Sequence, residues 1–298
     1  MSFTEKLKKS KYFPIIAVVL ALLIWLGQTA YEYLQKEEQP VVESTCTVHF
    51  VDVGQGDCTL ITCGGYSLLI DAGENGHESE VINYLRNHGI EKLDYVIVTH
   101  QHSDHIGGMA EVLEEFEADV IIMPRLTKAQ TPTNSTYTAF LRAVEASQAK
   151  VVSAKPGSVY NLGGATFEIL GPVTDDAEDI NNMSAVTKLT FGENTFLITG
   201  DAETEEELEI LDNGADIDCD VLRAGHHGSY TSSCKDWLAA ATPEICVISC
   251  GEGNDYGHPH DTALKRIKKH TQEIYRTDIC GDIVMVSDGK NITVDYAA

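Results

Sequence analysis

The pattern of apolar and polar positions separates an N-terminal segment from a longer region made of short, evenly spaced elements. Residues 13–26 are almost continuously apolar, and no residue from Tyr12 to Tyr31 carries a charge. A helix of about 20 such residues spans a bilayer. We therefore expect residues 1–35 to form a basic flank followed by one transmembrane helix.

The charges around the apolar stretch predict its orientation. Lysines cluster within residues 6–11, and positively charged flanks stay in the cytoplasm, so the rest of the chain is expected outside it. Residues 27–30 match a signal-peptidase site poorly, which favours a single-pass membrane anchor over a cleaved, secreted form. Residues 36–44 are interpreted as a polar linker, and residues 45–298 as the folded domain.

The region from Thr45 onward alternates short β-rich runs with stretches of helical periodicity. Strands come first and mixed strands and helices follow, an order that occurs twice and fits an α/β sandwich of two sheets with helices outside. Thr204 and Glu207 match a capping box at the start of one helix. The expected strands cover residues 45–53, 58–62, 66–70, 95–99, 120–123, 158–160, 165–170, 185–191, 195–199, 220–223, 245–249, 283–286 and 292–294, and the expected helices cover 78–87, 106–117, 135–148, 204–214 and 262–270.

The charge is strongly and unevenly negative. The chain of 298 residues has 46 acidic and 21 basic residues and a net charge of -25. Such a chain lacks the broad basic face with which many proteins bind nucleic acid, although brief contact at a local site stays open. A solvated helix face is the favoured interpretation of the basic cluster near the C-terminus, and a phosphate-facing patch is the alternative. This cluster comprises Lys265, Arg266, Lys268, Lys269 and Arg276.

The eight cysteines all follow the apolar segment. An exported domain permits disulfides, whereas cysteines within apolar runs are equally consistent with buried thiols, so both interpretations stay open. No C-x-x-C pair occurs, which argues against a structural zinc knuckle.

A histidine-rich loop carries the clearest chemical signal. His100, His102, Asp104 and His105 form an H-x-H-x-D-H pattern directly after the apolar strand expected at residues 95–99. Imidazole and carboxylate groups are the natural ligands of zinc and related divalent ions. The end of a strand also supplies a rigid edge from which such a loop can project. The pattern therefore predicts a metal site.

This motif resembles that of the metallo-β-lactamase superfamily, whose fold is a four-layer αββα sandwich. The resemblance implies that His100 and His102 bind one metal ion and that Asp104 and His105 bind a second. It also implies that Asp201, after a strand and Gly200, bridges both ions.

The same resemblance assigns a late histidine to the second metal. His226 and His227 both follow the strand expected at residues 220–223. Adjacent residues on an extended backbone point in opposite directions, so we expect one of them to be the ligand and favour His226.

One histidine that is usual in the superfamily is missing, because no histidine lies between His105 and His226. Oxygen groups of Asn181–Ser184 could contribute instead. Fewer imidazoles make manganese, or a single filled site, as reasonable as two zinc ions.

The departure points to one branch of the superfamily. The chain resembles the soluble C-terminal domain of ComEC-type DNA-uptake proteins over nearly all of residues 45–294. It has one apolar span in place of their many, so we expect that it does not transport DNA by itself. The motifs that carry this resemblance are Asp52–Asp57, Asp71–Gly73, Asn181–Ser184, His226–Ser229 and Gly257–His260.

Within this interpretation several further residues receive roles. Asp71 would brace the ligand loop, with a turn-capping role as the alternative. Ser229, Thr231 and His258 could bind substrate oxygens, although ordinary turn chemistry explains the two hydroxyls as well.

The expected function is a membrane-anchored, metal-dependent hydrolase outside the cytoplasm. One or two zinc or manganese ions would activate water, Asp104 would orient that water, and the resemblance implies a phosphodiester substrate, either a small molecule or transiently bound single-stranded DNA. Two alternatives stay open: a hydrolase of small esters, lactones or lactams, and a non-catalytic binding module that keeps the fold.

Overall fold

The computed structural model describes residues 45–296. The expected transmembrane helix and linker lie outside the described residues. Among residues 45–296, no helix combines the length and apolar character needed to cross a membrane. The fold described below is that of the compact unit that begins at Ser44.

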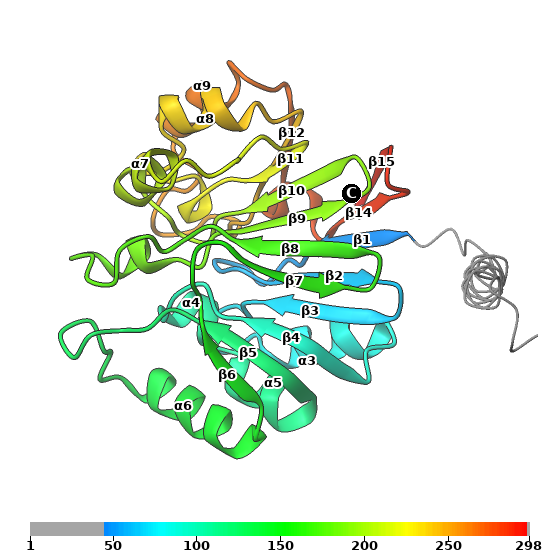
Figure 1. Ribbon diagram of the computed structural model, residues 1–298, viewed down its shortest axis with the longest axis vertical. Coiled ribbons are helices and arrows are strands. Elements are labelled where there is room, and N and C mark those ends of the chain that lie inside the picture. The colour runs from blue at the N-terminus through cyan, green and yellow to red at the C-terminus, as the bar shows by residue number, and fades with distance from the viewer. Residues whose placement is uncertain (1–44, 297–298) are drawn as a thin grey trace, which may run out of the picture. The chain divides into compact units, whose positions relative to one another are not determined.

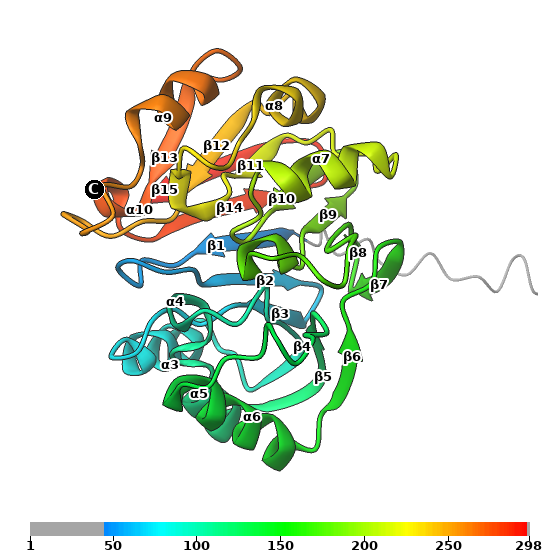
Figure 2. The ribbon, with the colours of Figure 1, turned by 90° about the vertical axis from the view of Figure 1, so that its left-hand side faces the viewer.

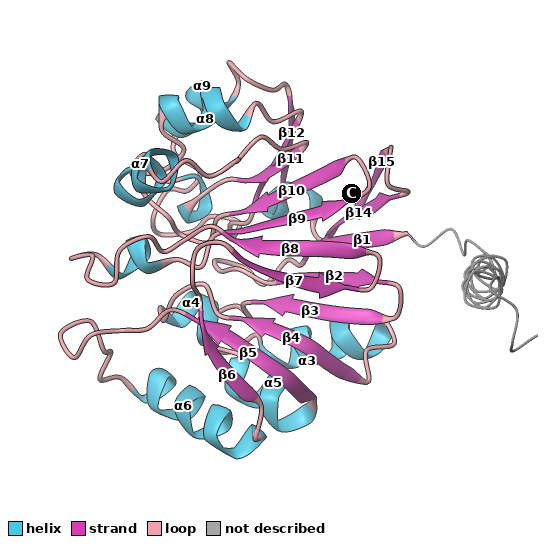
Figure 3. Ribbon diagram, viewed as in Figure 1, coloured by secondary structure: helices cyan, strands magenta, loops and turns pink. Residues whose placement is uncertain are grey.

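Two β-sheets form the centre of this unit, and helices lie outside them, as one view coloured by position and by secondary structure shows (Figures 1 and 3). In spatial order, the 8-stranded sheet contains β15 (Ile292–Tyr296), β14 (Ile283–Ser287), β1 (Cys46–Phe50), β2 (Thr59–Cys63), β3 (Tyr66–Ile70), β4 (Lys92–Ile97), β5 (Glu117–Met123) and β6 (Lys150–Ser153). The 7-stranded sheet contains β13 (Glu273–Arg276), β12 (Ile245–Ile248), β11 (Val221–Arg223), β10 (Asn194–Ile198), β9 (Thr187–Phe191), β8 (Ala165–Ile169) and β7 (Ser158–Leu162).

Helices cover the outer face of each sheet (Figure 2). The 8-stranded sheet is covered by α3 (Glu78–Asn87), α4 (Ser103–Ile106), α5 (Met109–Glu115) and α6 (Ser135–Ser147). The 7-stranded sheet is covered by α7 (Thr204–Asp212), α8 (Lys235–Ala241) and α9 (Asp261–Ile267), and the short elements α10 (Thr277–Cys280), Ile180–Met183 and His226–Gly228 complete the chain.

Alternation along single strands explains how three apolar layers form. In β3, Leu68 and Ile70 belong to the core between the sheets, whereas Leu69 packs with the helices outside. In β10, Phe196 likewise faces the central core and Leu197 the outer one. Successive side chains of a strand point to opposite faces, so strands buried on both faces are apolar throughout.

Parallel pairing brings the functional loops together. β3, β4 and β5 are parallel neighbours in one sheet, and β10, β11 and β12 are parallel neighbours in the other. Parallel strands end at the same edge of a sheet, where ligands are commonly bound. The loop His100–His105 follows β4, Asp201 follows β10, and His226 follows β11. All three segments therefore lie directly after strands that take part in parallel pairing.

Several expected elements are confirmed with their bounds, including the strand Tyr66–Ile70 and the helix Glu78–Asn87. The helix expected over residues 106–117 is wrong in its length, because α4 ends at Ile106 and α5 begins at Met109. A Cβ atom at Gly107 would lie 2.2 Å from the backbone nitrogen of Asn75. The break between α4 and α5 therefore allows the backbone at Gly107 to pack closely against the backbone at Asn75. Elements β6, β13, α8 and α10 were not expected.

The predicted capping box is also wrong. The N-cap of α7 is Glu203, and its side chain makes no capping hydrogen bond. The Thr204 hydroxyl instead donates to the backbone oxygen of Thr231 at 2.6 Å. The Glu207 carboxylate accepts from the backbone N–H groups of Ser233 and Cys234. Tertiary partners therefore replace the local ones that the spacing suggested.

All eight cysteines are free thiols in this structure. Seven of them are buried, which agrees with the buried-thiol interpretation. Cys46 and Cys63 lie opposite each other in the pairing of β1 with β2.

Candidate metal centre

Asp71 makes hydrogen bonds that fix the position of the loop His100–His105. Its two carboxylate oxygens accept hydrogen bonds from the backbone N–H and the hydroxyl of Thr99, at 2.8 and 2.6 Å. Its Oδ2 atom also lies 2.7 Å from Nδ1 of His105. This pairing leaves Nε2 of His105 buried without a hydrogen-bond partner. A metal-binding histidine commonly uses one ring nitrogen for a carboxylate and the other for the ion, so the bracing role expected for Asp71 agrees with its contacts.

Asp201 lies at the centre of the histidines. Its Oδ2 atom is 4.0 Å from Nε2 of His100 and 3.3 Å from Nε2 of His105. The backbone N–H of Asp201 donates to the hydroxyl of Ser184 at 3.0 Å, which holds the residue after β10 in place. A single carboxylate oxygen that faces several imidazoles can bridge neighbouring ions.

His100 and His102 form one side of this arrangement. Nε2 of His100 lies 3.0 Å from Nδ1 of His102, and the two rings meet nearly edge to face. Nε2 of His100 also lies 4.0 Å from Oδ2 of Asp201. That these three residues hold the first metal ion stays a prediction.

The other side contains the second expected group with one difference. Ligand atoms of Asp104, His105, Asp201 and His227 all lie within 4.8 Å of one another. Nε2 of His227 is 3.2 Å from Asp104 Oδ2 and 3.5 Å from Asp201 Oδ2. The structure thus places His227, and not the favoured His226, in this group.

The reason is the backbone of the His-His pair. His226 and His227 have φ angles of 49° and 52°, in the left-handed region, and so are not on the extended backbone that we expected. Both rings consequently face Asp201, with Nε2 of His226 3.7 Å from Oδ2. Consecutive left-handed residues other than glycine are strained, and such strain concentrates at functional sites. Which of the two binds metal stays a prediction.

The two histidines differ in their supports. His227 is buried, and its Nδ1 atom donates to the backbone oxygen of Ser249 at 3.0 Å, which leaves Nε2 free for an ion. His226 is partly exposed, and its Nδ1 lies 3.0 Å from the carboxylate of Glu203. Hydrogen bonding from His226 lowers the pKa of Glu203.

Electrostatics at the centre favour a bound cation. Burial alone would lower the pKa of His105, but Asp201, Asp104 and Asp71 outweigh it and hold that pKa well above its usual value. Burial would raise the pKa of Asp201, yet the charges of His227 and His105 hold it well below. Burial and the charge of His105 depress the pKa of His100. The centre without metal therefore keeps a proton on His105 and a neutral ring at His100.

Arg223 and Asp57 support the centre and were missed by sequence reasoning. The buried guanidinium of Arg223 pairs with the buried carboxylate of Asp57 and donates to the backbone oxygen of Gly200. It also lies 3.8 Å from Oδ1 of Asp201. An arginine within the apolar strand β11 was the one available signal, since a buried charge needs a partner.

Of the residues expected to bind substrate, His258 faces the site and the hydroxyl residues do not. The Thr231 hydroxyl donates to Glu203 at 2.6 Å, and it also lies 2.9 Å from the hydroxyl of the buried Ser229. Neither residue lines the cavity at the metal centre. Thr231 instead contacts Glu203, the partner of His226, and Ser229 contacts Thr231.

A cavity of about 290 Å³ lies over the centre and shares lining residues with two larger ones. It shares His102 and Asn134 with a cavity of about 610 Å³. It shares Asp104 and Tyr256 with another of about 450 Å³. We call the three together the site groove. The central cavity is lined by Gln55, His102, Ser103, Asp104, Asn134, Asn181, Asp201, His226, His227, Tyr256 and His258.

Asn181 belongs to the segment Asn181–Ser184, whose oxygen groups could replace the missing histidine. It lines the central cavity, and its buried Oδ1 atom has no hydrogen-bond partner. Asn182 is engaged elsewhere, since its Oδ1 accepts from the backbone N–H of Glu203 at 3.0 Å. Asn181 is therefore the member of this motif that is free to supply an oxygen ligand.

The basic cluster does not reach the groove. None of the described residues that line its three cavities is Lys or Arg. Arg266 donates to backbone oxygens of Tyr230, Ser232 and Ser233, and Arg276 pairs with Asp278. These two cations have structural partners.

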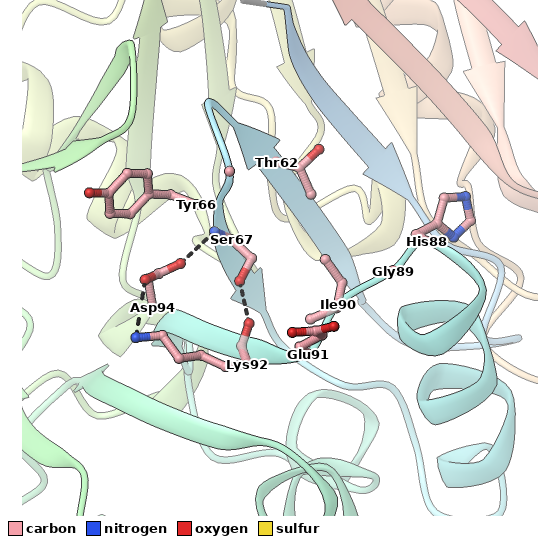
Figure 4. Close-up of a pocket in the computed structure, with 10 residues that line it drawn as sticks. Thr62, Tyr66, Ser67, His88, Gly89, Ile90, Glu91, Lys92 and Asp94 are labelled. Atoms are coloured by element: carbon pink, nitrogen blue, oxygen red, sulfur yellow. Dashed lines mark hydrogen bonds and ion pairs between the residues drawn. The ribbon is translucent and has the colours of Figure 1, made fainter.

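Another cavity, of about 410 Å³, lies away from the metal centre beside β3 and the loop after α3 (Figure 4). Two of its charged residues pair with each other: Lys92 lies 3.6 Å from Asp94, which also accepts from the backbone N–H of Ser67 at 2.8 Å.

Comparison with known proteins identifies the family. Residues 51–252 match the model of the metallo-beta-lactamase superfamily. The chain belongs to the metallo-β-lactamase superfamily. As members of this superfamily are metal-dependent hydrolases, the predicted enzyme class and the requirement for divalent ions are confirmed by this match and by the geometry of the centre. The identity of the metal stays open.

The relatives of this superfamily member include competence proteins, as the ComEC resemblance predicted. It is 29% identical to ComE operon protein 3 of Bacillus subtilis, over 82% of this chain and 33% of that protein. It is 30% identical to Recombination protein 2 of Haemophilus influenzae, over 80% and 28%, respectively. It is 27% identical to Competence protein ComA of Neisseria gonorrhoeae, over 90% and 37%. The chain thus spans about a third of the length of these relatives.

A solved structure shows the same fold. CmlA, a diiron β-hydroxylase from Streptomyces venezuelae, superposes with a TM-score of 0.54 and 13% identity, over 80% of this chain and 53% of CmlA. Similarity at this level concerns the fold alone.

Proposed function

We propose that this superfamily member hydrolyses phosphodiester bonds of nucleic acid outside the cytoplasm, with zinc or manganese bound at Asp201. The observation that carries the proposal is the position of Asp201 Oδ2, within 4.0 Å of ring nitrogens from His100, His105, His226 and His227. The partial similarity to competence and recombination proteins supports a DNA-related substrate.

The residues fit divalent ions in two adjacent groups. Asp104, His105, His227 and Asp201 would hold one ion. His100 and His102, whose facing ring nitrogens lie 3.0 Å apart, would hold the other together with Asp201, which is 4.0 Å from His100. The buried, unpartnered Nε2 of His105 is the independent sign that a ligand belongs there. When bound, such ions lower the pKa of water toward about 7 and polarise a phosphoryl oxygen.

The chain's own groups position the reactants. Asp104 lines the central cavity, where its carboxylate could orient the attacking water. Burial and the nearby His227 lower the pKa of His258 to about 4, so His258 is neutral at pH 7. The Gln55 amide lies 3.4 Å from Nδ1 of His258 and donates to it. Nε2 of His258 then carries the proton and can donate to a substrate oxygen.

The shape of the site supports an extended substrate over a small ester, lactone or lactam. The central cavity has a larger neighbour on each of two sides, and it shares lining residues with both. A polymer could lie along such a groove, with the scissile bond above Asp201.

The decisive experiment measures metal and cleavage together. The purified chain should bind one or two ions per molecule and should cleave bis-p-nitrophenyl phosphate and single-stranded DNA when zinc or manganese is supplied. His100→Ala should abolish both. His270→Ala, at an exposed histidine after α9, is the matched control. Absence of bound metal and of cleavage with either ion would refute the proposal.

Anchoring by residues 1–35 is a separate proposal, supported by the apolar run at residues 13–26. We expect the chain in the membrane fraction, with its folded domain digested by protease added to intact spheroplasts. Recovery of the chain in the cytosolic fraction would overturn the anchor and leave the chemistry untouched.

A further inference from the structure

We propose that Tyr256 forms a stacking site for a nucleobase beside the metal centre, so that the enzyme binds nucleic acid through its bases as well as its phosphates. This inference rests on the proposed function and deepens it. The proposed stacking site does not require Tyr256 to contact a metal-binding residue.

Tyr256 is an exposed ring at the mouth of the site. Its side chain is 67% exposed, and it lines both the central cavity and the 450 Å³ cavity of the site groove. One face of the ring stacks on His258, with centroids 5.6 Å apart and planes 18° apart. His258 in turn stacks on His227, at 5.9 Å and 29°. A row of rings therefore leads from solvent to the metal centre.

The loop that carries Tyr256 is held firmly in place. The Asn254 side chain donates to the backbone oxygens of Gly251 and His258 and accepts from the backbone N–H of His258. The Gln55 side chain also accepts from the backbone N–H of Gly251, at 3.1 Å. An aromatic ring held in advance loses little conformational entropy when a ligand stacks on it.

The charge of the groove explains why a stacking site is needed. Its lining contains several carboxylates and, among the described residues, no Lys or Arg. Proteins that bind single strands usually gain affinity from basic grooves and from base stacking, the latter about 1–3 kcal/mol per base. Here the bound divalent ions must attract the phosphates, and uncharged contacts with the bases must supply the rest. The carboxylates are Glu74, Asp104, Glu178, Asp179, Asp201, Glu252 and Asp255.

A matched pair of substrates isolates the effect of the base. One is a 15-nucleotide oligothymidylate, and the other has the same length and backbone but abasic tetrahydrofuran sites. Both have the same charge, so a difference between them reports contacts to bases. Cleavage is measured as kcat/KM with manganese, and binding as fluorescence anisotropy.

The variants are Tyr256→Leu, which removes the aromatic face, and Tyr256→Phe, which keeps it. Wild type and Tyr256→Phe should bind and cleave the oligothymidylate about 5- to 150-fold better than the abasic strand, as expected for one stacked base. Tyr256→Leu should lose most of this preference, which is a ratio between the two strands and so does not depend on a change common to both. Tyr66→Leu, at a tyrosine that is 49% exposed beside the separate cavity of Figure 4, should retain the full preference.

The outcomes separate the two proposals. If wild type cleaves both strands equally, or if Tyr256→Leu keeps the preference, the stacking site is refuted and the phosphodiesterase stands. If wild type cleaves neither strand but binds the oligothymidylate more tightly in a Tyr256-dependent way, the stacking site stands and the phosphodiesterase is refuted. Equal weakening on both strands by Tyr256→Leu also refutes stacking, because it indicates damage to the centre.

Discussion

Two buried carboxylates near the start of α7 have opposite properties. Asp201 and Glu206 are both about 1% exposed. The imidazoles of His227 and His105 hold the pKa of Asp201 well below its usual value despite its burial. Both oxygens of Glu206 lack hydrogen-bond partners, and burial raises its pKa well above the usual value. Burial alone neutralises a carboxylate, and cationic partners keep it charged. Of these two carboxylates, only Asp201 therefore lies in an environment that attracts a metal ion.

Glu207, the next residue in α7, is also a buried carboxylate with a raised pKa. Burial raises its pKa to about 7, although the backbone N–H groups of Cys234 and Ser233 counteract that rise. Its hydrogen bonds tie α7 to the loop that follows His227. The carboxylates of α7 therefore support the architecture of the site, and those at the strand ends support its chemistry.

The largest effect is expected from neutralising each carboxylate without changing its shape. Asp201→Asn removes the charge shared by both metal groups, so bound metal and cleavage should fall by more than the roughly 10–100-fold typical of losing a supporting partner. Glu206→Gln should keep both within about twofold. Metal analysis and kcat/KM measure this contrast. Equal losses in the two variants would show that the comparison is wrong.

The next largest effect should come from Asp71→Asn. Asp71 contacts His105 at 2.7 Å and fixes which ring nitrogen is free. Its replacement should weaken metal affinity roughly 10–100-fold without unfolding the domain. Titration with a metal-sensitive dye reports the affinity, and circular dichroism serves as the control for folding. Unchanged affinity would leave Asp71 with only its turn-capping hydrogen bonds to Thr99.

Metal binding should also compete with protons. The carboxylates hold the pKa of His105 above its usual value, so the free centre is protonated at neutral pH. Since an ion must displace that proton, affinity should fall as pH decreases, by up to about tenfold per pH unit for each proton released. Calorimetry in two buffers of different ionisation enthalpy counts the protons. A count of zero would contradict the protonation assigned to His105.

The smallest effect concerns stability without metal. The pKa values of Glu206 and Glu207 are raised in the folded state, so their contribution is complete below the usual value of 4.5 and is lost as pH rises through the raised values, about 7 for Glu207. Glu206→Gln should reduce the slope of the unfolding free energy against pH, by at most about 1.4 kcal/mol per pH unit. Asp201 has the opposite sign, because its contribution is lost as pH falls below 3.8. Urea unfolding between pH 5 and 8 in chelator measures the slopes. Parallel profiles for wild type and Glu206→Gln would place the titration elsewhere.

Local patterns in the sequence were sufficient to predict many strands of the two sheets and part of the candidate metal centre. The strand Tyr66–Ile70 and the helix Glu78–Asn87 were predicted with their observed bounds, because alternation and periodicity report burial directly. The spacing of the loop after β4 also indicated a metal site. The capping box at Thr204 failed, because a spacing rule cannot register the competing partners in the loop after His227.

The sequence by itself determined which chemical groups this protein carries and that the ends of its strands present them. The tertiary structure alone decided which way these side chains point and which partners they contact. The left-handed backbone turns both His226 and His227 toward Asp201, and β11 brings Arg223 to Asp57. The physical reason is that ligand identity is a local property, whereas the direction of a side chain and the partners of a buried charge depend on segments distant in the chain.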